Sequence, residues 1–347
     1  MIGNPLVGII GVALISLAIY DAAQTTLSAS RSGPLTNRLV SLAWTLLLHY
    51  HRRHHGHRLL SAAGPWSALA LVLLWFLLAW AGWFLLFCSA PQAVVNSTTS
   101  ASATLMERAY FTGYTITTLG YGDFVPGGDA WRIPPVLAAG NGFFLFTLSI
   151  TYVANIVSAV MQKRQLALSI SALGNCPYSI IRATADNGEF DSFSSQLRTL
   201  QSIINSSGQQ HLTYPILHYF HGEYSDNALP LALARLYQAL ALVCFACPGL
   251  PSASRTQLII ARHTIDQFLR TLGSAFIHPA PAIPEIPPLD EYAALPGFDK
   301  SPEAMRDYLQ SLDHQRLLLA YVRMDGWEWR HVWEPLSARA DDQPRTP

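Results

Sequence analysis

Long runs of apolar residues dominate the first half of the chain. A helix needs about 20 apolar residues to cross a bilayer core of roughly 30 Å. Three runs approach or exceed that length without a charged residue: Pro5 to about Tyr20, about Trp66 to Cys88, and about Ile133 to Met161. The pattern predicts three membrane-spanning helices.

The first run is short for a membrane span, so the residues before it must contribute. We assign residues 1–22 to an N-terminal transmembrane helix. A cleavable signal peptide is the alternative, but signal peptides begin with basic residues. Residues 1–4 contain neither Lys nor Arg. This end of the chain therefore favours a retained helix.

The composition agrees with a membrane protein. Hydrophobic residues make up 50% of the 347 positions and charged residues only 13%, about half the charged share of typical soluble domains. Acidic and basic residues balance at 22 each, which gives no indication of a nucleic-acid partner. The spacing Cys244-Phe-Ala-Cys247 lacks a second pair that would complete a metal site. We expect buried thiols there.

Basic residues predict how the spans are oriented. The segment between the first two spans has one acid, Asp21, at its start and five arginines: Arg31, Arg38, Arg52, Arg53 and Arg58. Lys163 and Arg164 follow the third span. Because basic loops stay in the cytoplasm, we place the N-terminus outside and the C-terminal half in the cytoplasm. We expect a multi-pass protein of a cell (inner) membrane, in a bacterium.

The cytoplasmic loop, residues 23–64, contains an apolar stretch that is too short to span. Arg38 to Tyr50 predicts a helix lying along the inner membrane interface. A histidine-rich cluster, residues 49–57, follows it. This cluster could sense pH or bind a metal. The simpler alternative is a basic loop that touches anionic lipid.

A distinctive motif lies between the second and third spans. Leu105 to Thr117 is long enough for a short helix, and Thr118-Leu119-Gly120-Tyr121-Gly122-Asp123 follows it. The whole stretch resembles the potassium-channel family, whose selectivity filter is usually written T-V-G-Y-G. The resemblance covers about Trp66 to Arg164.

The resemblance implies a fold and a function. It implies an all-α membrane protein with an outer helix (66–88), a pore helix (105–117), a filter (118–122) and an inner helix (133–161), together forming a pore domain over residues 65–164. A filter needs four such loops, so the assembly is expected to be a homotetramer embedded in membrane lipid. Potassium ions would bind at Thr118, Leu119, Gly120 and Tyr121, and no organic cofactor is expected.

The residue types of the motif suit this chemistry. Successive carbonyls can face one axis only if alternate residues adopt unusual dihedrals, and Gly120 and Gly122 adopt positive φ at little cost. Thr118 can add its hydroxyl as a ligand, while Tyr121 can brace the filter from behind. The C-terminal dipole of the pore helix favours a cation beyond its end.

Flanking residues extend the resemblance and also depart from it. Asp123 follows the filter as in the family, and Trp131 and Arg132 begin the inner helix. Gly142, with Gly140 as a near alternative, occupies the position of the family's gating hinge. Close helix packing is the other explanation for either glycine. Filter support is expected from Asp123, Tyr110, Phe111, Tyr114 and Thr117, although Leu119, Tyr110, Phe111 and Tyr114 replace residues more usual in the family.

The C-terminal half, residues 165–347, is predicted to be a helical cytoplasmic domain. Apolar periodicity and capping residues predict four helices: Glu189–Asn205, Asn227–Cys247, Ala253–Leu272 and Pro302–Met324, with Ser301 as N-cap and Gly326 as stop. The second of these is a buried core helix or, alternatively, a fourth span. The proline-rich segment 278–296 is expected to be an extended linker or surface arm. We expect the aromatic cluster Trp327 to Trp333 to pack against a neighbouring subunit.

No ligand-sensing motif is visible in that half. It has no Gly-x-Gly-x-x-Gly turn after a strand and no EF-hand loop. His218 and His221, with His211 and Glu223 nearby, could bind a metal on a predicted helix, although ordinary structural histidines are the simpler interpretation.

These patterns favour a passive potassium channel, gated or stabilised by its cytoplasmic domain through an unidentified stimulus. A weakly selective cation channel is one alternative. A membrane-anchored sensor or binding protein with a non-conducting pore is another. No nucleophile elbow, phosphate-binding loop or metal-ligand set is visible, so we do not expect an enzyme.

Overall fold

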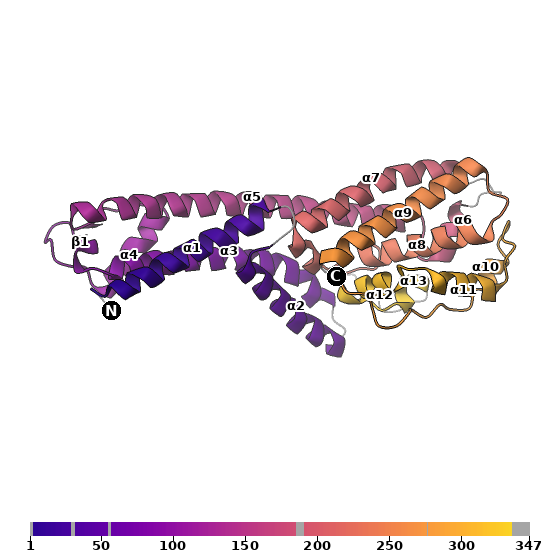
Figure 1. The fold of residues 1–347 in the computed structure, drawn as a ribbon, viewed down its shortest axis with the longest axis horizontal. Coiled ribbons are helices and arrows are strands. Elements are labelled where there is room, and N and C mark those ends of the chain that lie inside the picture. Colours follow the sequence, from indigo (N-terminus) through magenta and orange to yellow (C-terminus); the bar gives the residue numbers. More distant parts are fainter. Residues whose placement is uncertain (1–2, 29–31, 55–56, 185–190, 276, 335–347) are drawn as a thin grey trace, which may run out of the picture. The chain divides into compact units, whose positions relative to one another are not determined.

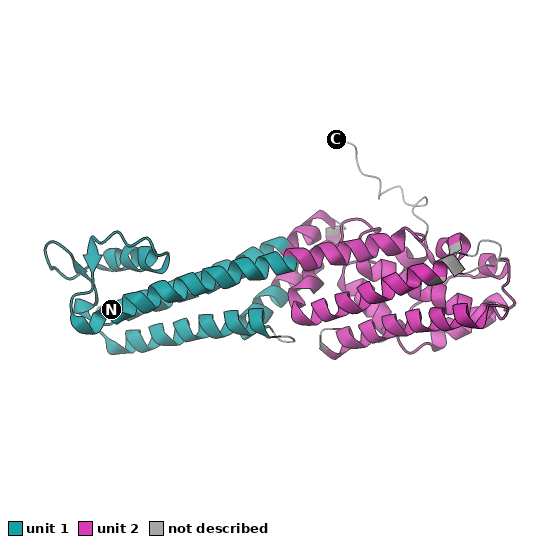
Figure 2. Ribbon diagram, turned by 90° about the horizontal axis from the view of Figure 1, so that it is seen from above, with its two compact units in different colours: residues 1–42, 65–156 teal, residues 43–64, 157–347 magenta. Residues whose placement is uncertain are grey.

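The computed structural model describes residues 3–28, 32–54, 57–184, 191–275 and 277–334, and it is helical almost throughout (Figure 1). Within those residues the only strands are β1 (Val95–Asn96) and β2 (Phe124–Val125), an antiparallel pair that closes one loop. The expected all-α fold is confirmed. The chain divides into two compact units (Figure 2): unit 1 is Met1–Leu42 with Pro65–Ile156, and unit 2 is Ala43–Gly64 with Val157–Pro347.

Unit 1 holds the first two apolar runs of the sequence and most of the third. They lie in α1 (Pro5–Leu27), α3 (His57–Cys88) and α5 (Ile133–Ser171), and each helix extends beyond its apolar run. The short helix α4 (Leu105–Ile116) lies between α3 and α5, preceded by η1 (Pro91–Ala93) and followed by η2 (Asp129–Trp131). All three long helices are long and apolar enough to cross a membrane. The chain is therefore a membrane protein with several apolar helices.

A buried carboxylate joins three helices of unit 1. Asp21, near the end of α1, accepts hydrogen bonds from the Leu35 backbone nitrogen (2.7 Å) and the Thr36 hydroxyl (2.6 Å). Both donors lie in the first turn of α2 (Pro34–His54). The indole nitrogen of Trp75 in α3 also donates to Asp21, at 2.8 Å. Asp21 thus acts as an N-cap for α2 supplied by another helix, which satisfies backbone donors that the helix itself leaves unpaired.

Unit 2 is a helical domain built around α8 (Leu229–Ala246). This helix is a fourth candidate span by length and composition, but 89% of its apolar window is buried inside the protein. Contacts on it come from α6 (Pro177–Thr184), α9 (Ser252–Ala275), α11 (Pro302–Ser311), α12 (Gln315–Met324) and α13 (Arg330–Trp333). Its burial fits a core helix. The remaining elements are α7 (Asp191–Thr213), which packs along α9, η3 (Pro215–Tyr219) and α10 (Asp290–Ala293).

The predicted helix Pro302–Met324 is wrong in one respect, because it is two helices. Leu312 adopts an extended conformation (ψ 130°) and ends α11. Polar contacts with the rest of unit 2 hold the break. His314 lies 3.0 Å from the Asp266 carboxylate, and the side-chain amides of Gln315 and Gln238 exchange two hydrogen bonds. The predicted boundaries hold, with Ser301 capping α11 and Gly326 (φ +86°) following α12.

Two further expectations for unit 2 are corrected. Trp327 and Trp329 are buried within the core of this same chain, so they do not need a neighbouring subunit to cover them. The proline-rich segment contains no long helix, but it is not a free arm. Ile286 and Leu289 are buried in the core, and the Glu285 carbonyl accepts a hydrogen bond from the Trp329 indole at 2.9 Å.

The helix α5 belongs to both units. Its residues up to Ile156 are part of unit 1, whereas Leu166, Ala167 and Ile170 are buried in the hydrophobic core of unit 2. The helix therefore does not end at Met161, where its apolar run ends.

Candidate ion-conduction site

The helix α4 is held at its start by a capping box. The Thr104 hydroxyl accepts from the Glu107 backbone nitrogen, and the Glu107 carboxylate accepts from the Thr104 backbone nitrogen at 2.7 Å. These reciprocal bonds satisfy donors at the helix N-terminus. At the other end of α4 the carbonyls of Gly113, Tyr114 and Thr115 accept hydrogen bonds from backbone nitrogens of residues 117–120. This end of the helix dipole carries a partial negative charge.

The backbone after α4 alternates in conformation. Thr118, Gly120 and Gly122 all have positive φ, at +63°, +58° and +82°. The backbone nitrogens of Leu119 and Gly120 both donate to the Tyr114 carbonyl, at 2.8 and 3.4 Å. The two glycines were expected to adopt positive φ. Thr118 was not, because a β-branched residue rarely does, and such an outlier is characteristic of a functional site.

A cluster of aromatic rings surrounds this backbone. Tyr121 lies between Tyr110, stacked at a centroid distance of 6.1 Å, and Tyr114, edge-on at 5.8 Å. The Tyr114 hydroxyl donates to the Phe124 carbonyl at 2.8 Å, which ties α4 to β2. Phe111 packs edge-on against Phe87 of α3. Tyr110 and Phe111 also pack edge-on against Tyr114, so the three expected supporting aromatics lie in one cluster.

The remaining expected residues lie at the two ends of the motif. The Thr117 hydroxyl donates to the Gly113 carbonyl at 2.8 Å, which closes the last turn of α4. Asp123 is exposed, and its carboxylate accepts from the Phe124 backbone nitrogen at 3.1 Å. Leu119 and Tyr121 leave 62% and 64% of their surfaces exposed in the single chain. Apolar surface of this size, next to strained backbone, is typical of an interface.

Sequence reasoning missed the central role of Arg108 in α4. Its guanidinium is fully buried and donates to five uncharged oxygens: the carbonyls of Phe87, Ala90, Pro91 and Ala103, and the Ser102 hydroxyl. The carbonyls of Phe87 and Ala90 lie at and just beyond the C-terminal end of α3, where carbonyls lack helical partners. Arg108 therefore fastens α4 to the end of α3. The only available signal was a lone arginine inside an apolar region.

The two candidate hinge glycines of α5 have different surroundings. A Cβ atom added at Gly142 would collide with the backbone carbonyl of Ile116, the last residue of α4. A Cβ added at Gly140 would meet nothing within 4 Å. In addition, the Asn141 side chain accepts a hydrogen bond from the Trp83 indole of α3 at 3.0 Å. Close packing on α4 thus gives Gly142 a purpose that does not require the helix to bend.

A cavity of about 510 Å³ opens beside the end of α4. Most of its lining is apolar and comes from α3 and α5, and Thr117 and Thr118 lie at one side. The other lining residues are Val72, Leu73, Phe76, Ile116, Gly142, Phe143, Leu145, Phe146 and Ser149. The cavity brings the first residues of the motif within reach of open space.

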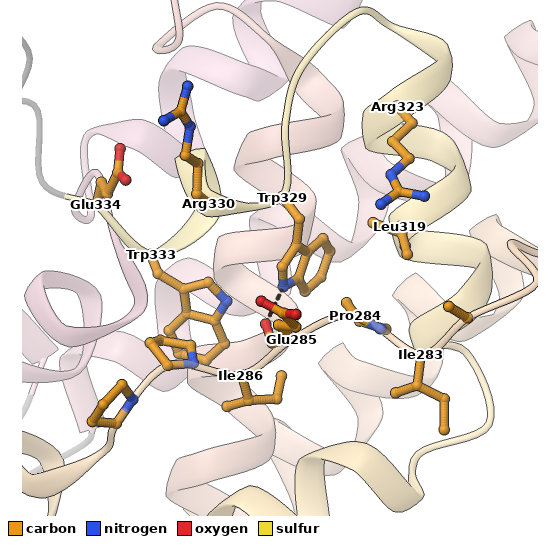
Figure 3. A pocket seen from close by; sticks show the side chains of 13 residues that line it. Ile283, Pro284, Glu285, Ile286, Leu319, Arg323, Trp329, Arg330, Trp333 and Glu334 are labelled. Carbon is orange, nitrogen blue, oxygen red and sulfur yellow. Dashed lines mark hydrogen bonds between the residues drawn. The ribbon is translucent and has the colours of Figure 1, made fainter.

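A second cavity, of about 650 Å³, lies in unit 2 between the proline-rich segment and helices α12 and α13 (Figure 3). Trp329 and Trp333 form one wall, with Ile283 and Ile286 below them (Figure 3). Arg323 and Arg330 at its border are balanced by Glu285 and Glu334. The lining therefore favours neither an anionic nor a cationic ligand.

The histidines of the C-terminal half do not form a metal site. His211 lies in α7, His218 in η3 and His221 beyond it, so His218 and His221 do not share the predicted helix. Among the described residues, no group of three His, Cys, Asp or Glu side chains could hold a metal ion. Burial and the nearby Lys163 lower the pKa of His211 to about 3, and burial with His211 beside it holds the pKa of His218 well below its ordinary value. Both rings therefore stay neutral at physiological pH.

The comparison with protein families concerns this same region. Residues 70–159 match a family model described as ion channel. The matched stretch contains most of the apolar run of α3, the whole of α4, the motif 118–122 and the first two thirds of α5. The match supports passive ion conduction and points to a transport role rather than an enzymatic one.

The comparison with curated proteins extends over both units. The chain is 29% identical to YdjJ of Bacillus subtilis (strain 168), described as an uncharacterized membrane protein, over 325 residues that cover 92% of this chain and 94% of YdjJ. The similarity thus includes unit 2, which lies mostly outside the ion channel match. No solved structure matches the chain.

Proposed function

We propose that the chain is one subunit of a homotetrameric, potassium-selective channel in which residues 118–122 form the selectivity filter. The observation that carries the proposal is the positive φ at Thr118, Gly120 and Gly122. Alternation of this kind allows neighbouring carbonyls to be directed toward one side, and rings of such carbonyls can replace the hydration shell of potassium. Potassium ions would bind at Thr118, Leu119, Gly120 and Tyr121.

Exposure of the motif supports assembly. A single chain contributes one such loop, whereas a carbonyl ring of this kind needs four. In the single chain Leu119 and Tyr121 are largely exposed. Identical neighbours would cover these side chains while leaving the carbonyls free to face a central axis. We place unit 2 in the cytoplasm and the loop containing α4 outside, as the basic residues indicate.

The decisive test compares two glycine substitutions. Gly120 and Gly128 both have open space around the Cβ position, but only Gly120 has positive φ. Gly120→Ala is therefore a purely conformational change, with Gly128→Ala as its matched control. In proteoliposomes with a potassium gradient, we expect Gly120→Ala to abolish rubidium uptake while leaving the assembled mass unchanged, and Gly128→Ala to preserve uptake. Equal uptake in the two variants would refute the filter assignment.

Selectivity has its own measurement. With potassium on one side of a planar bilayer and sodium on the other, a potassium filter gives a reversal potential near the potassium equilibrium value. A reversal near zero would favour a weakly selective cation channel. Barium resembles potassium in size but carries twice the charge, so it should block by binding at the same carbonyls; insensitivity would count against them.

A further inference from the structure

Three histidines from separate elements meet in unit 2. They are His51 near the end of α2, His57 at the start of α3, and His221 after η3. The centroid of the His57 ring lies 4.7 Å from that of His51 and 5.1 Å from that of His221. The His57 ring also stacks on Trp327, at a centroid distance of 4.4 Å. The α2–α3 segment, residues 43–64, thus meets the loops of unit 2 through titratable rings.

A hydrogen bond between two imidazoles joins the segment to the loop. His57 Nδ1 lies 2.9 Å from His221 Nε2. A bond of this kind requires one nitrogen to donate and the other to accept, so at least one of the two rings must be neutral. The bond therefore survives a single added proton on His57 and is lost when both rings are protonated.

A neighbouring carboxylate favours one direction of this bond. The second nitrogen of His221, Nδ1, faces the Asp325 carboxylate at 3.3 Å. A proton on Nδ1 toward Asp325 leaves Nε2 of the neutral ring as the acceptor, so His57 donates. The same carboxylate lies 4.0 Å from the buried Lys163 ammonium, which also donates to the carbonyls of Leu217 and Phe220. Asp325 is therefore already balanced by one cation before any histidine gains a proton.

Other charged and titratable side chains of the described residues lie near the cluster. Arg58 and Glu223 pair at 3.5 Å on the surface. His331 of α13 lies behind Trp327, where its ring accepts from the Glu328 backbone nitrogen. His211 and His218 remain neutral through burial. His51 donates from Nε2 to the Gly326 carbonyl at 3.2 Å.

The α2–α3 segment packs tightly against the loops of unit 2, close to the three histidines. Gly64 lies against the Phe220 ring, where an added Cβ would come within 2.6 Å of a ring carbon. Gly326 likewise approaches the fully buried Leu60. In both places a glycine backbone packs directly against a side chain of the other segment. Small side-chain shifts therefore cannot relieve repulsion among the histidines.

We propose that His51, His57 and His221 form a proton-binding site through which pH controls the docking of the α2–α3 segment onto the loops of unit 2. At neutral pH the His57–His221 bond holds the segment in place. In acid, protons on all three rings put three imidazolium groups and Lys163 around a single carboxylate, and the segment separates from the loops. The segment continues into α3 and Lys163 lies on α5, so the change reaches both long helices of the pore region through the chain itself.

Hydrogen–deuterium exchange of the full-length protein in lipid nanodiscs tests the site. Exchange is compared at about pH 7.5 and about pH 5.5, a range in which ordinary histidines titrate, with labelling times corrected for the intrinsic rate. We expect peptides covering 57–64 and 217–224 to gain exchange in acid. The gain should be on the order of tenfold per pH unit for each proton linked to opening.

Variants in which neutral amides replace the cluster histidines are compared with the wild-type protein. In His57→Asn with His221→Gln, amides stand at the positions of the bonded nitrogens and cannot titrate. His51→Gln keeps an N–H donor for the Gly326 carbonyl. This variant replaces the double variant in the experiment if the double variant fails to fold. His263→Gln, at an exposed histidine of α9, is the matched control. We expect the cluster variants to lose all or part of the acid response and the control to keep it.

Two results overturn the proposal. One is a wild-type protein whose two peptides exchange equally at both pH values after correction. The other is a cluster variant with the full wild-type response. The proton site itself does not depend on the proposed function; only its consequence for conduction does. Rubidium uptake at both pH values is therefore measured separately, and absence of uptake in every protein would count against the channel while the exchange data still decide the proton site.

Discussion

Single substitutions at two glycines of α5 can show whether these positions serve packing of α5 on α4 or bending of α5. Gly142 touches the Ile116 carbonyl, whereas Gly140 faces open space. We expect Gly142→Ala to push α4 away from α5, to lower rubidium uptake strongly, and to reduce the melting temperature of the assembled protein. Gly140→Ala should leave both nearly unchanged or raise stability slightly, since alanine favours a helix by up to about 1 kcal/mol over glycine.

The reverse result would identify a different role. If Gly140→Ala were the variant that impaired uptake while Gly142→Ala were tolerated, packing on α4 would not explain these positions. Bending of α5 at Gly140 would then be the better account. Single-channel recording would show such an effect as altered opening, with conductance in the open state unchanged.

His211 leads to a prediction about pH and stability. Its pKa is held at about 3 in the folded protein, whereas an unfolded histidine titrates near ~6.5. Below that value the unfolded chain binds more protons, so stability is fully present above about pH 6.5 and falls as the pH drops toward about 3. The loss should reach about 1.4 kcal/mol per pH unit for this residue.

The measurement is the melting temperature of the full-length protein between about pH 7 and about pH 5. His211→Leu should flatten the dependence by removing the titrating ring, at some cost in stability at neutral pH because the bond to the Ser207 carbonyl (2.8 Å) is lost. His263→Gln should keep the wild-type slope. A slope unaffected by His211→Leu would mean that other groups cause the acid sensitivity.

At the scale of elements, Arg108 is the main link between α4 and α3. Replacement by Gln leaves several carbonyls without donors in a buried place, each costing about 1–3 kcal/mol. We expect Arg108→Gln to lower the melting temperature markedly and to reduce uptake, because α4 then no longer holds the motif in place. Arg132→Gln is the matched control, since the Arg132 side chain is 73% exposed and pairs with Asp129 on the surface. Equal effects of the two changes would contradict the structural role of Arg108.

Helices could be predicted from the sequence where a long apolar run or a capping residue marked them. The spans follow from uninterrupted apolar runs, α11 begins after Ser301, and α12 ends just before Gly326. The break at Leu312 was not predictable, because it depends on Gln315 meeting Gln238 from a helix 77 residues away in sequence. The capping of α2 by Asp21 was hidden for the same reason: a lone acid at the end of an apolar run shows nothing about its distant partners.

The same division holds for the candidate site. Gly120 and Gly122 could be assigned because glycine alone adopts positive φ easily. Thr118 could not, since local propensity opposes the conformation that the neighbouring bonds to Tyr114 impose. The histidine cluster of residues 49–57 was visible in the sequence, but its partners His221 and Asp325 were not. Long-range contacts of single polar residues leave no periodic trace.

At the scale of the whole molecule, the continuity of α5 determines what a truncation tests. Deletion of residues 165–347 removes the partners of Lys163, which is buried in the intact protein. It also uncovers Trp44 and Leu60, which cluster with Tyr219. We expect such a protein to assemble less stably and to open differently, while the ratio of potassium to sodium permeability stays the same because residues 118–122 are untouched.

The position of the truncation provides the internal control. Ending the chain after Arg164 removes the part of α5 that belongs to the core of unit 2. Ending it after Ser171 retains Leu166, Ala167 and Ile170 without the core that buries them, so this protein should aggregate more. Both should give the same reversal potential with potassium and sodium on opposite sides. If the longer or the shorter truncation changed that potential, unit 2 would help to shape the filter, and the separation of selectivity from regulation between the two units would be wrong.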